Sequence, residues 1–168
     1  MESEAMGFNF ILWGNMVRRQ LPEDMRAFVD SVDPASWYPT EKLIALLSHL
    51  RDTQGAVRLD ACGRAIYYTL KEDLEKMGVH TPEQALLSIV HAYEENVRGS
   101  DAGEWRLLEN EPNRVVLEDR TCFAPTMVNV GVAIGAAKAF GGQDVQAKVQ
   151  TRHEGEQMIH VIEVSWTD

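Results

Sequence analysis

The stretch PTMVNVGVAIGAAKAFG, residues Pro125 to Gly141, decides the fold. It is apolar almost all round, and between Met127 and Phe140 only Asn129 and Lys138 interrupt it. A proline in the first turn and a glycine just past the end are typical of a helix. A helix without a polar face is buried on every side, and this one is too short to span a membrane comfortably. We therefore predict a central core helix, in which Gly131 and Gly135 let another backbone approach closely.

Length, charge and cysteine content set the class of protein. The chain has 168 residues and a formal net charge of -10, from 16 Lys+Arg against 26 Asp+Glu. This length predicts one domain over residues 1–168, and the acidic balance argues against binding nucleic acid or an anionic membrane surface. Cys62 and Cys122 are the only cysteines, too few for a disulfide framework, which favours a reducing cytoplasm. We predict no signal peptide and no membrane-spanning segment.

Helical and alternating patterns fill the chain before the core helix. Alternation of apolar residues over 8–12 predicts a strand, and residues 22–32 predict a helix, so that 1–36 form an N-terminal extension. Three further amphipathic helices are predicted after Pro39, around residues 59–77, and from Thr81, which can cap its helix.

Two strand pairs flank the core helix, at 104–109 with 114–119 and at 144–152 with 157–166. Inward-facing apolar residues set the register of the last hairpin, because directly opposite residues share a face. The predicted opposite pairs are Val145 with Trp166, Ala147 with Val164, Val149 with Ile162, and Thr151 with His160. The predicted fold class is α+β, an antiparallel sheet of about four strands with helices on one face around the buried, glycine-containing helix.

The order of strand pair, apolar helix and strand pair after amphipathic helices resembles the 4-vinyl reductase domain family over residues 37–166. That family belongs to a superfamily with TRAPP vesicle-tethering subunits and the sensing domains of some aromatic-catabolism activators. The residues that carry the resemblance are Gly63, Cys122, Pro125, Gly131, Gly135 and Gly155. The resemblance implies a helix-on-sheet pocket for an apolar ligand, and dimerisation. Many members carry cysteines beside the last hairpin, and none is present here.

Four residues are candidates for ligand binding: Cys62, Tyr67, Trp105 and His160. His160 points inward opposite Thr151, where it could sense pH or contact a ligand, or be a core histidine hydrogen-bonded to Thr151. Tyr67 and Trp105 could line a pocket or pack in the core. Cys62 is either a reactive thiol or a small buried hydrophobe, and the same alternatives apply to Cys122.

No metal or cofactor site is predicted. His153 and His160 are diagonal neighbours on one face, but the pattern supplies no third ligand. A heme-ligand role for His91 would require a heme pocket that the sequence does not reveal. Fingerprints for phosphate or dinucleotide binding are absent from the sequence.

These observations favour a cytoplasmic, non-catalytic sensory domain that binds a small apolar molecule. The alternative is a homodimeric assembly module without a ligand, for which Ile159 and Val161 on the outer face of the sheet, or the apolar stretch Phe8 to Trp13, would supply the interface. An enzyme ranks last, because no catalytic constellation is evident.

Overall fold

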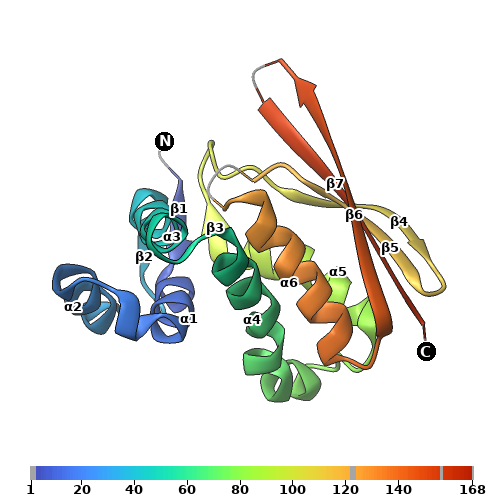
Figure 1. Ribbon diagram of the computed structural model, residues 1–168, viewed down its shortest axis with the longest axis horizontal. Coiled ribbons are helices and arrows are strands. Elements are labelled where there is room, and N and C mark those ends of the chain that lie inside the picture. The colour runs from blue at the N-terminus through green and yellow to red at the C-terminus, as the bar shows by residue number, and fades with distance from the viewer. Residues whose placement is uncertain (1–2, 122–123, 156, 168) are drawn as a thin grey trace.

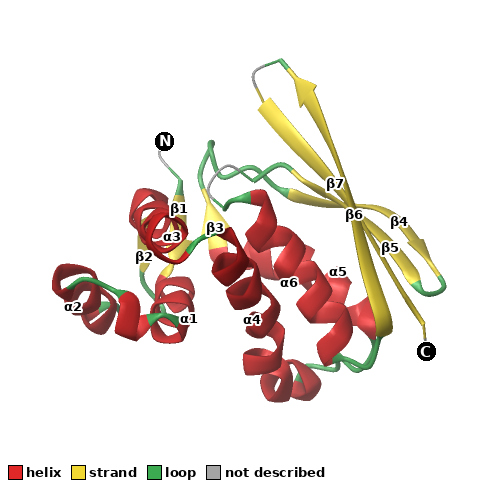
Figure 2. Ribbon diagram, viewed as in Figure 1, coloured by secondary structure: helices red, strands yellow, loops and turns green. Residues whose placement is uncertain are grey.

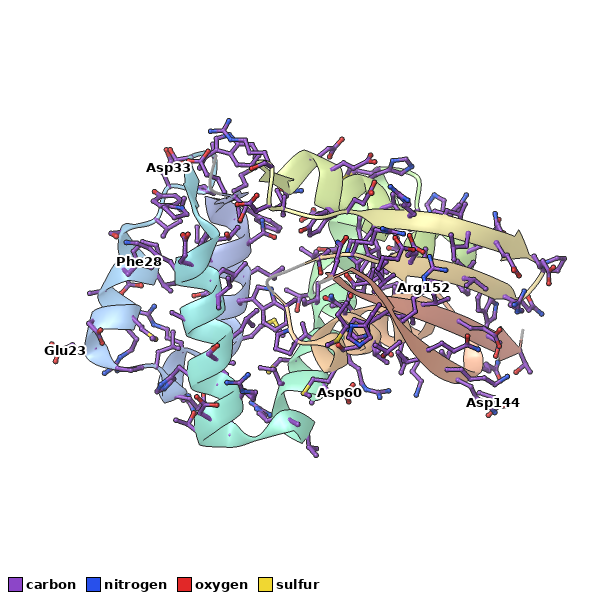
Figure 3. All side chains as sticks on the ribbon, turned by 90° about the horizontal axis from the view of Figure 1, so that it is seen from above. Glu23, Phe28, Asp33, Asp60, Asp144 and Arg152 are labelled. Atoms are coloured by element: carbon purple, nitrogen blue, oxygen red, sulfur yellow. The ribbon has the colours of Figure 1, made fainter. Side chains whose placement is uncertain are left out.

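The computed structural model describes residues 3–121, 124–155 and 157–167, which form two lobes (Figure 1). The N-terminal lobe contains β1 (Glu4–Met6), α1 (Gly7–Met16), a 3-10 turn (Arg18–Gln20), α2 (Glu23–Ser31), β2 (Trp37–Pro39) and α3 (Thr40–Gln54). The C-terminal lobe contains α4 (Ala56–Lys76), α5 (Pro82–Asn96), β3 (Val97–Arg98), β4 (Trp105–Glu111), β5 (Arg114–Asp119), α6 (Thr126–Ala139), β6 (Gln143–Glu154) and β7 (Gln157–Thr167). Seen from above, Phe28 marks the first lobe and Arg152 the sheet of the second (Figure 3).

The predicted α+β class is confirmed. The larger sheet is antiparallel with strand order β4-β5-β7-β6, and α6 contacts its last two strands. In the last hairpin, three of the four predicted pairs form: Ala147 with Val164, Val149 with Ile162, and Thr151 with His160. The fourth prediction is wrong, because Val145 and Trp166 are not paired in the described strands. A bulge interrupts the ladder between Gln143 and Gln146, where the backbone of Asp144 has a positive φ of 46°.

The predicted core helix is α6, and it packs backbone to backbone on α4. A Cβ placed on Gly131 would lie 2.6 Å from the carbonyl oxygen of Asp60, and one on Gly63 would lie 2.5 Å from that of Val128. At Gly135 the carbonyl of Arg64 is closer still. Glycines from both helices therefore permit the crossing. No described helix, α6 included, has both the length and the apolar composition needed to cross a membrane.

The strand predicted at residues 8–12 is wrong, because these residues belong to α1. The buried side chains of this segment are Phe10, Trp13 and Val17, which recur at helical rather than alternating spacing. Phe10 makes edge-on contacts with the rings of Phe28 and Tyr38, at 5.6 and 5.7 Å between centroids. The first strand is instead β1, which lies between β2 and β3 in a three-stranded sheet.

The outer face of the larger sheet is covered by ion pairs within one chain. Ile159 and Val161 were predicted to be available there for a partner, but Ile159 is 0% exposed and Val161 is half-buried. Glu118 on the same face is almost fully buried and pairs with Arg152 and, at 2.5 Å, with Arg120. Arg120 also reaches Glu154 at 3.0 Å. The observation that suggested an interface at Ile159 is therefore absent from the folded chain.

Acid is expected to weaken a second ion-pair cluster on this sheet. The guanidinium of Arg114 bonds Glu163 at 2.9 Å and, with Lys148, lowers the pKa of that carboxyl. A lowered pKa stabilises the fold above the ordinary glutamate pKa of about 4.3, and the contribution is lost as pH falls through the lowered value. Arg114→Met should therefore reduce the melting temperature more at pH 7 than at pH 3. Lys76→Met, in the exposed pair with Asp73, is the control, and equal losses for Arg114→Met at both pH values would contradict this assignment.

Candidate functional site: a cavity between the lobes

A cavity of about 160 Å³ lies between the two lobes. Helices α1 and α3 border it from the N-terminal lobe, and α4, α5 and α6 from the C-terminal lobe (Figure 2). The lining side chains of the first group are Phe8, Asn9, Leu12, Trp13, Leu43 and Leu47. Those of the second group are Ile66, Tyr67, Leu70, Leu74, Ile89, Ala92, Tyr93, Asn96, Val97, Trp105, Ala124, Val128, Asn129 and Val132. Any occupant would contact both lobes at once.

The lining is apolar and uncharged. Among the described residues that form it there is no Asp, Glu, Lys, Arg, His, Cys or Met. Aromatic rings come from both lobes, as in Trp13 on α1 and Trp105 at the start of β4. Such a surface suits a neutral apolar molecule, because burying an unpaired charge in it would be costly.

Tyr67 is fixed in its protonated form. Its hydroxyl lies 2.9 Å from Ser88 Oγ, and that hydroxyl donates in turn to the Ala85 carbonyl at 2.7 Å. Because the single hydroxyl proton of Ser88 is donated to the Ala85 carbonyl, Tyr67 must be the donor in its hydrogen bond with Ser88. Burial raises the pKa of Tyr67, and the hydrogen bond from its own hydroxyl only partly opposes that rise. The phenol therefore stays neutral and keeps an oxygen lone pair available.

Asn129 is a buried polar residue of the cavity lining. Its Nδ2 donates to Asp119 Oδ2 at 2.6 Å and to Thr121 Oγ1 at 3.1 Å. Asp119 also accepts from the backbone N–H and the hydroxyl of Thr121. A carboxylate only accepts, so the amide group of Asn129 must face Asp119, and its orientation is determined.

The four predicted ligand-binding residues fall into two pairs. Tyr67 and Trp105 line the cavity, whereas Cys62 and His160 are not among its lining residues. Both ring nitrogens of His160 are engaged, with Thr126 Oγ1 at 2.8 Å and Thr151 Oγ1 at 3.0 Å, as in the alternative interpretation of a core histidine. Burial raises the pKa of the Cys62 thiol, with Arg58 opposing, so the reactive thiolate is disfavoured. Cys122 lies outside the described residues.

Histidines elsewhere in the described part of the chain do not assemble a metal site. No group of three His, Cys, Asp or Glu side chains that could hold an ion is found there. His91, considered above as a heme ligand, has a largely exposed side chain beside Glu94 and does not reach the cavity.

Sequence reasoning missed the contribution of α1 to the cavity. Phe8, Asn9, Leu12 and Trp13 were assigned to a strand, so their shared helical face was not recognised. Asn129 was also missed as a site residue. Its signal was present, because it is one of only three polar side chains in α6, with Thr126 and Lys138.

The comparison of folds corrects the family resemblance. The sequence matches no protein-family model and no curated protein. By structure, the chain is similar to one from a study of heme distortion in the H-NOX family, with a TM-score of 0.73 and 10% identity over 97% of this chain and 96% of that one. An oxygen-binding H-NOX domain related to soluble guanylate cyclases has a TM-score of 0.71 and 10% identity, over 96% of this chain and 93% of that one. A mutant H-NOX protein from K. algicida has a TM-score of 0.67 and 12% identity, over 97% of each chain.

These matches run through both lobes and include the residues that were assigned to an N-terminal extension. The resemblance to 4-vinyl reductase and TRAPP-like domains is therefore wrong, because the solved structures that this chain matches are H-NOX domains. The chain has the fold of H-NOX domains.

Proposed function

We propose that this chain is a sensory domain that binds a small, neutral, apolar molecule in the cavity between its lobes, without heme. The uncharged cavity bordered by both lobes is the observation that carries this proposal. A ligand held there can change how the lobes contact each other, which is what a sensory domain requires. The fold supports the same reading, since one structure that shares it is an oxygen-binding domain.

The described residues do not fit heme. Heme iron needs an axial ligand, ordinarily His, Cys, Met or Tyr, and only tyrosines occur among the described lining residues. Tyr67 donates its proton to Ser88, and Tyr93 donates its proton to the Ala102 carbonyl, so neither is poised to become the phenolate that binds iron. Among the described lining residues there is also no basic side chain to pair with the carboxylates of heme. The cavity of about 160 Å³ also lies below the roughly 300–1,000 Å³ of ordinary ligand sites.

The test combines a heme titration with binding of a small apolar probe. Hemin added to the purified chain should give no saturable shift of its Soret band. Benzene should bind saturably and raise the melting temperature, because a ligand specific for the folded state stabilises by about 2.7 kcal/mol at 100 times its Kd. A stoichiometric hemin complex, or no benzene binding at all, would contradict the proposal.

Filling the cavity should abolish benzene binding. Ala92 on α5 lines the cavity and is exposed, so Ala92→Phe adds a ring at the site with little disturbance of the core. Ala61→Phe is the matched control, since Ala61 is an exposed residue of α4 that is not among the lining residues. Equal binding by both variants would place the probe elsewhere.

Homodimerisation and a cytoplasmic location remain part of the proposal as predictions. The dimer no longer has Ile159 as its expected contact, because that side chain is buried within one chain. Light scattering at micromolar concentration measures the oligomeric state directly.

A further inference from the structure

We infer that the cavity selects a molecule of about one six-membered ring that carries a hydroxyl or N–H donor, and that Asn129 Oδ1 accepts its proton. This inference rests on the proposed function and adds the chemical class of the ligand to it. Two features of the site carry it: the unpaired acceptor of Asn129, and the volume of the cavity.

Asn129 has an acceptor to offer because its donors are already used. One N–H is bonded to Asp119 and the other to Thr121. The Thr121 hydroxyl spends its own proton on Asp119 Oδ1 at 2.7 Å, so it can only accept from Asn129. Turning the amide over would bring its oxygen against a carboxylate. Oδ1 is thus directed away from Asp119 and Thr121, and it has no hydrogen-bond partner among the described residues.

This oxygen meets the cavity rather than the packed interior. Asn129 is 7% exposed and lines the cavity. Among the described side chains, no fully enclosed polar atom lacks a hydrogen-bond partner. Oδ1 therefore borders free space, and the cavity is the space that Asn129 lines. Leaving such an acceptor unpaired against an apolar ligand is unfavourable, so a ligand with a donor is preferred.

Tyr67 makes the preference for a donor stronger. Tyr67 also lines the cavity, and its only hydroxyl proton is committed to Ser88, so it has no donor to offer a ligand. A ligand that offers only an acceptor, such as a ketone, would find no hydrogen-bond donor on Asn129 or Tyr67.

The volume matches a molecule of about one ring. An apolar cavity of about 150 Å³ binds benzene. The present cavity, at about 160 Å³, holds a molecule of the same size with one added polar atom.

Three ring compounds of nearly equal size test whether the cavity prefers a ligand with a hydrogen-bond donor. Cyclohexane has no polar group, cyclohexanone has only an acceptor, and cyclohexanol has a donor. Their affinities differ in water for reasons of solvation, so the decisive quantity is how each Kd changes with Asn129→Leu. We expect a loss of about tenfold or more for cyclohexanol, and no loss for cyclohexane or cyclohexanone. Asn15→Leu, at an exposed asparagine of α1 that is not among the lining residues, should leave the Kd of all three compounds unchanged.

If Asn129→Leu changes the Kd of all three compounds equally, the inference is overturned and the proposed function still stands. Failure of the wild-type chain to bind even cyclohexane would overturn both. If Asn129→Leu does not fold, the side-chain carbonyl ¹³C shift of Asn129 in the wild type decides. It should move with cyclohexanol and not with cyclohexane, and the same shift with both would contradict the inference.

Discussion

Gly135→Leu is expected to prevent the chain from folding. The α-carbon of Gly135 sits against the backbone of Arg64 on α4, where even a Cβ would overlap the carbonyl carbon at 2.8 Å. Overpacking a core ordinarily costs about 1–3 kcal/mol, and here the obstructing atoms are main chain that cannot rotate away. The total stability of a domain is only about 5–15 kcal/mol. Loss of soluble protein, or of the cooperative thermal transition, is the expected result.

A smaller side chain at position 135 should have a smaller effect. Gly135→Ala should still lower the melting temperature measurably, but less than Gly135→Leu does. Gly155→Ala is the control, because nothing lies within 4 Å of its Cβ and its positive φ of 62° is the only obstacle. That backbone conformation costs about 1–2 kcal/mol for an L-residue. A Gly135→Leu protein that melts like the wild type would show that α4 and α6 do not cross at this point.

Phe10→Ala is expected to produce the second largest loss, about 3–5 kcal/mol of unfolding free energy. Phe10 is 0% exposed and contacts the rings of Phe28 and Tyr38 edge-on, which ties α1 to α2 and β2. Removing its ring leaves a cavity and breaks two aromatic contacts. Urea denaturation monitored by circular dichroism measures the change.

Phe8→Ala is the matched control, because Phe8 lies on the same helix with 38% of its surface exposed. Its loss of stability should be much smaller, while its place in the cavity lining predicts weaker binding of benzene. The opposite order of the two stability losses would favour the alternating strand that the sequence suggested for this stretch.

The core of the C-terminal lobe could be predicted from sequence because its patterns are strong. The all-round apolar composition of α6 allows only a buried helix, and inward-facing Val149 and Ile162 fix the hairpin register. The bulge near Asp144 could not be predicted, since a single inserted residue leaves the apolar alternation beyond it intact. The α1 helix was missed because Phe8, Phe10 and Leu12 also fit an alternating pattern over a short window.

The cavity was predictable only in part. Tyr67 and Trp105 were selected for their aromatic rings, a property that core residues share. Cys62 and His160 were selected for their chemistry, but neither belongs to the described lining. What defines the cavity is the meeting of two lobes that are far apart in the sequence, and periodicity within one element carries no information about that meeting. The glycines of α4 and α6 misled the family assignment, because any close helix crossing requires small residues.

The three-stranded sheet of the N-terminal lobe also determines when the fold can be completed. Its middle strand is β1, yet one neighbour, β3, pairs through Arg98 with Glu4, 94 positions earlier in the chain. Arg98 also stacks its guanidinium on the Trp37 ring of the other neighbouring strand, 4.2 Å from its centroid. During synthesis β1 leaves the ribosome before β3, and it must wait for α3, α4 and α5 to emerge before its second edge is paired. Contacts of such long sequence separation slow folding, so we expect β1 to be fully paired late, although it is synthesised before both of its neighbours.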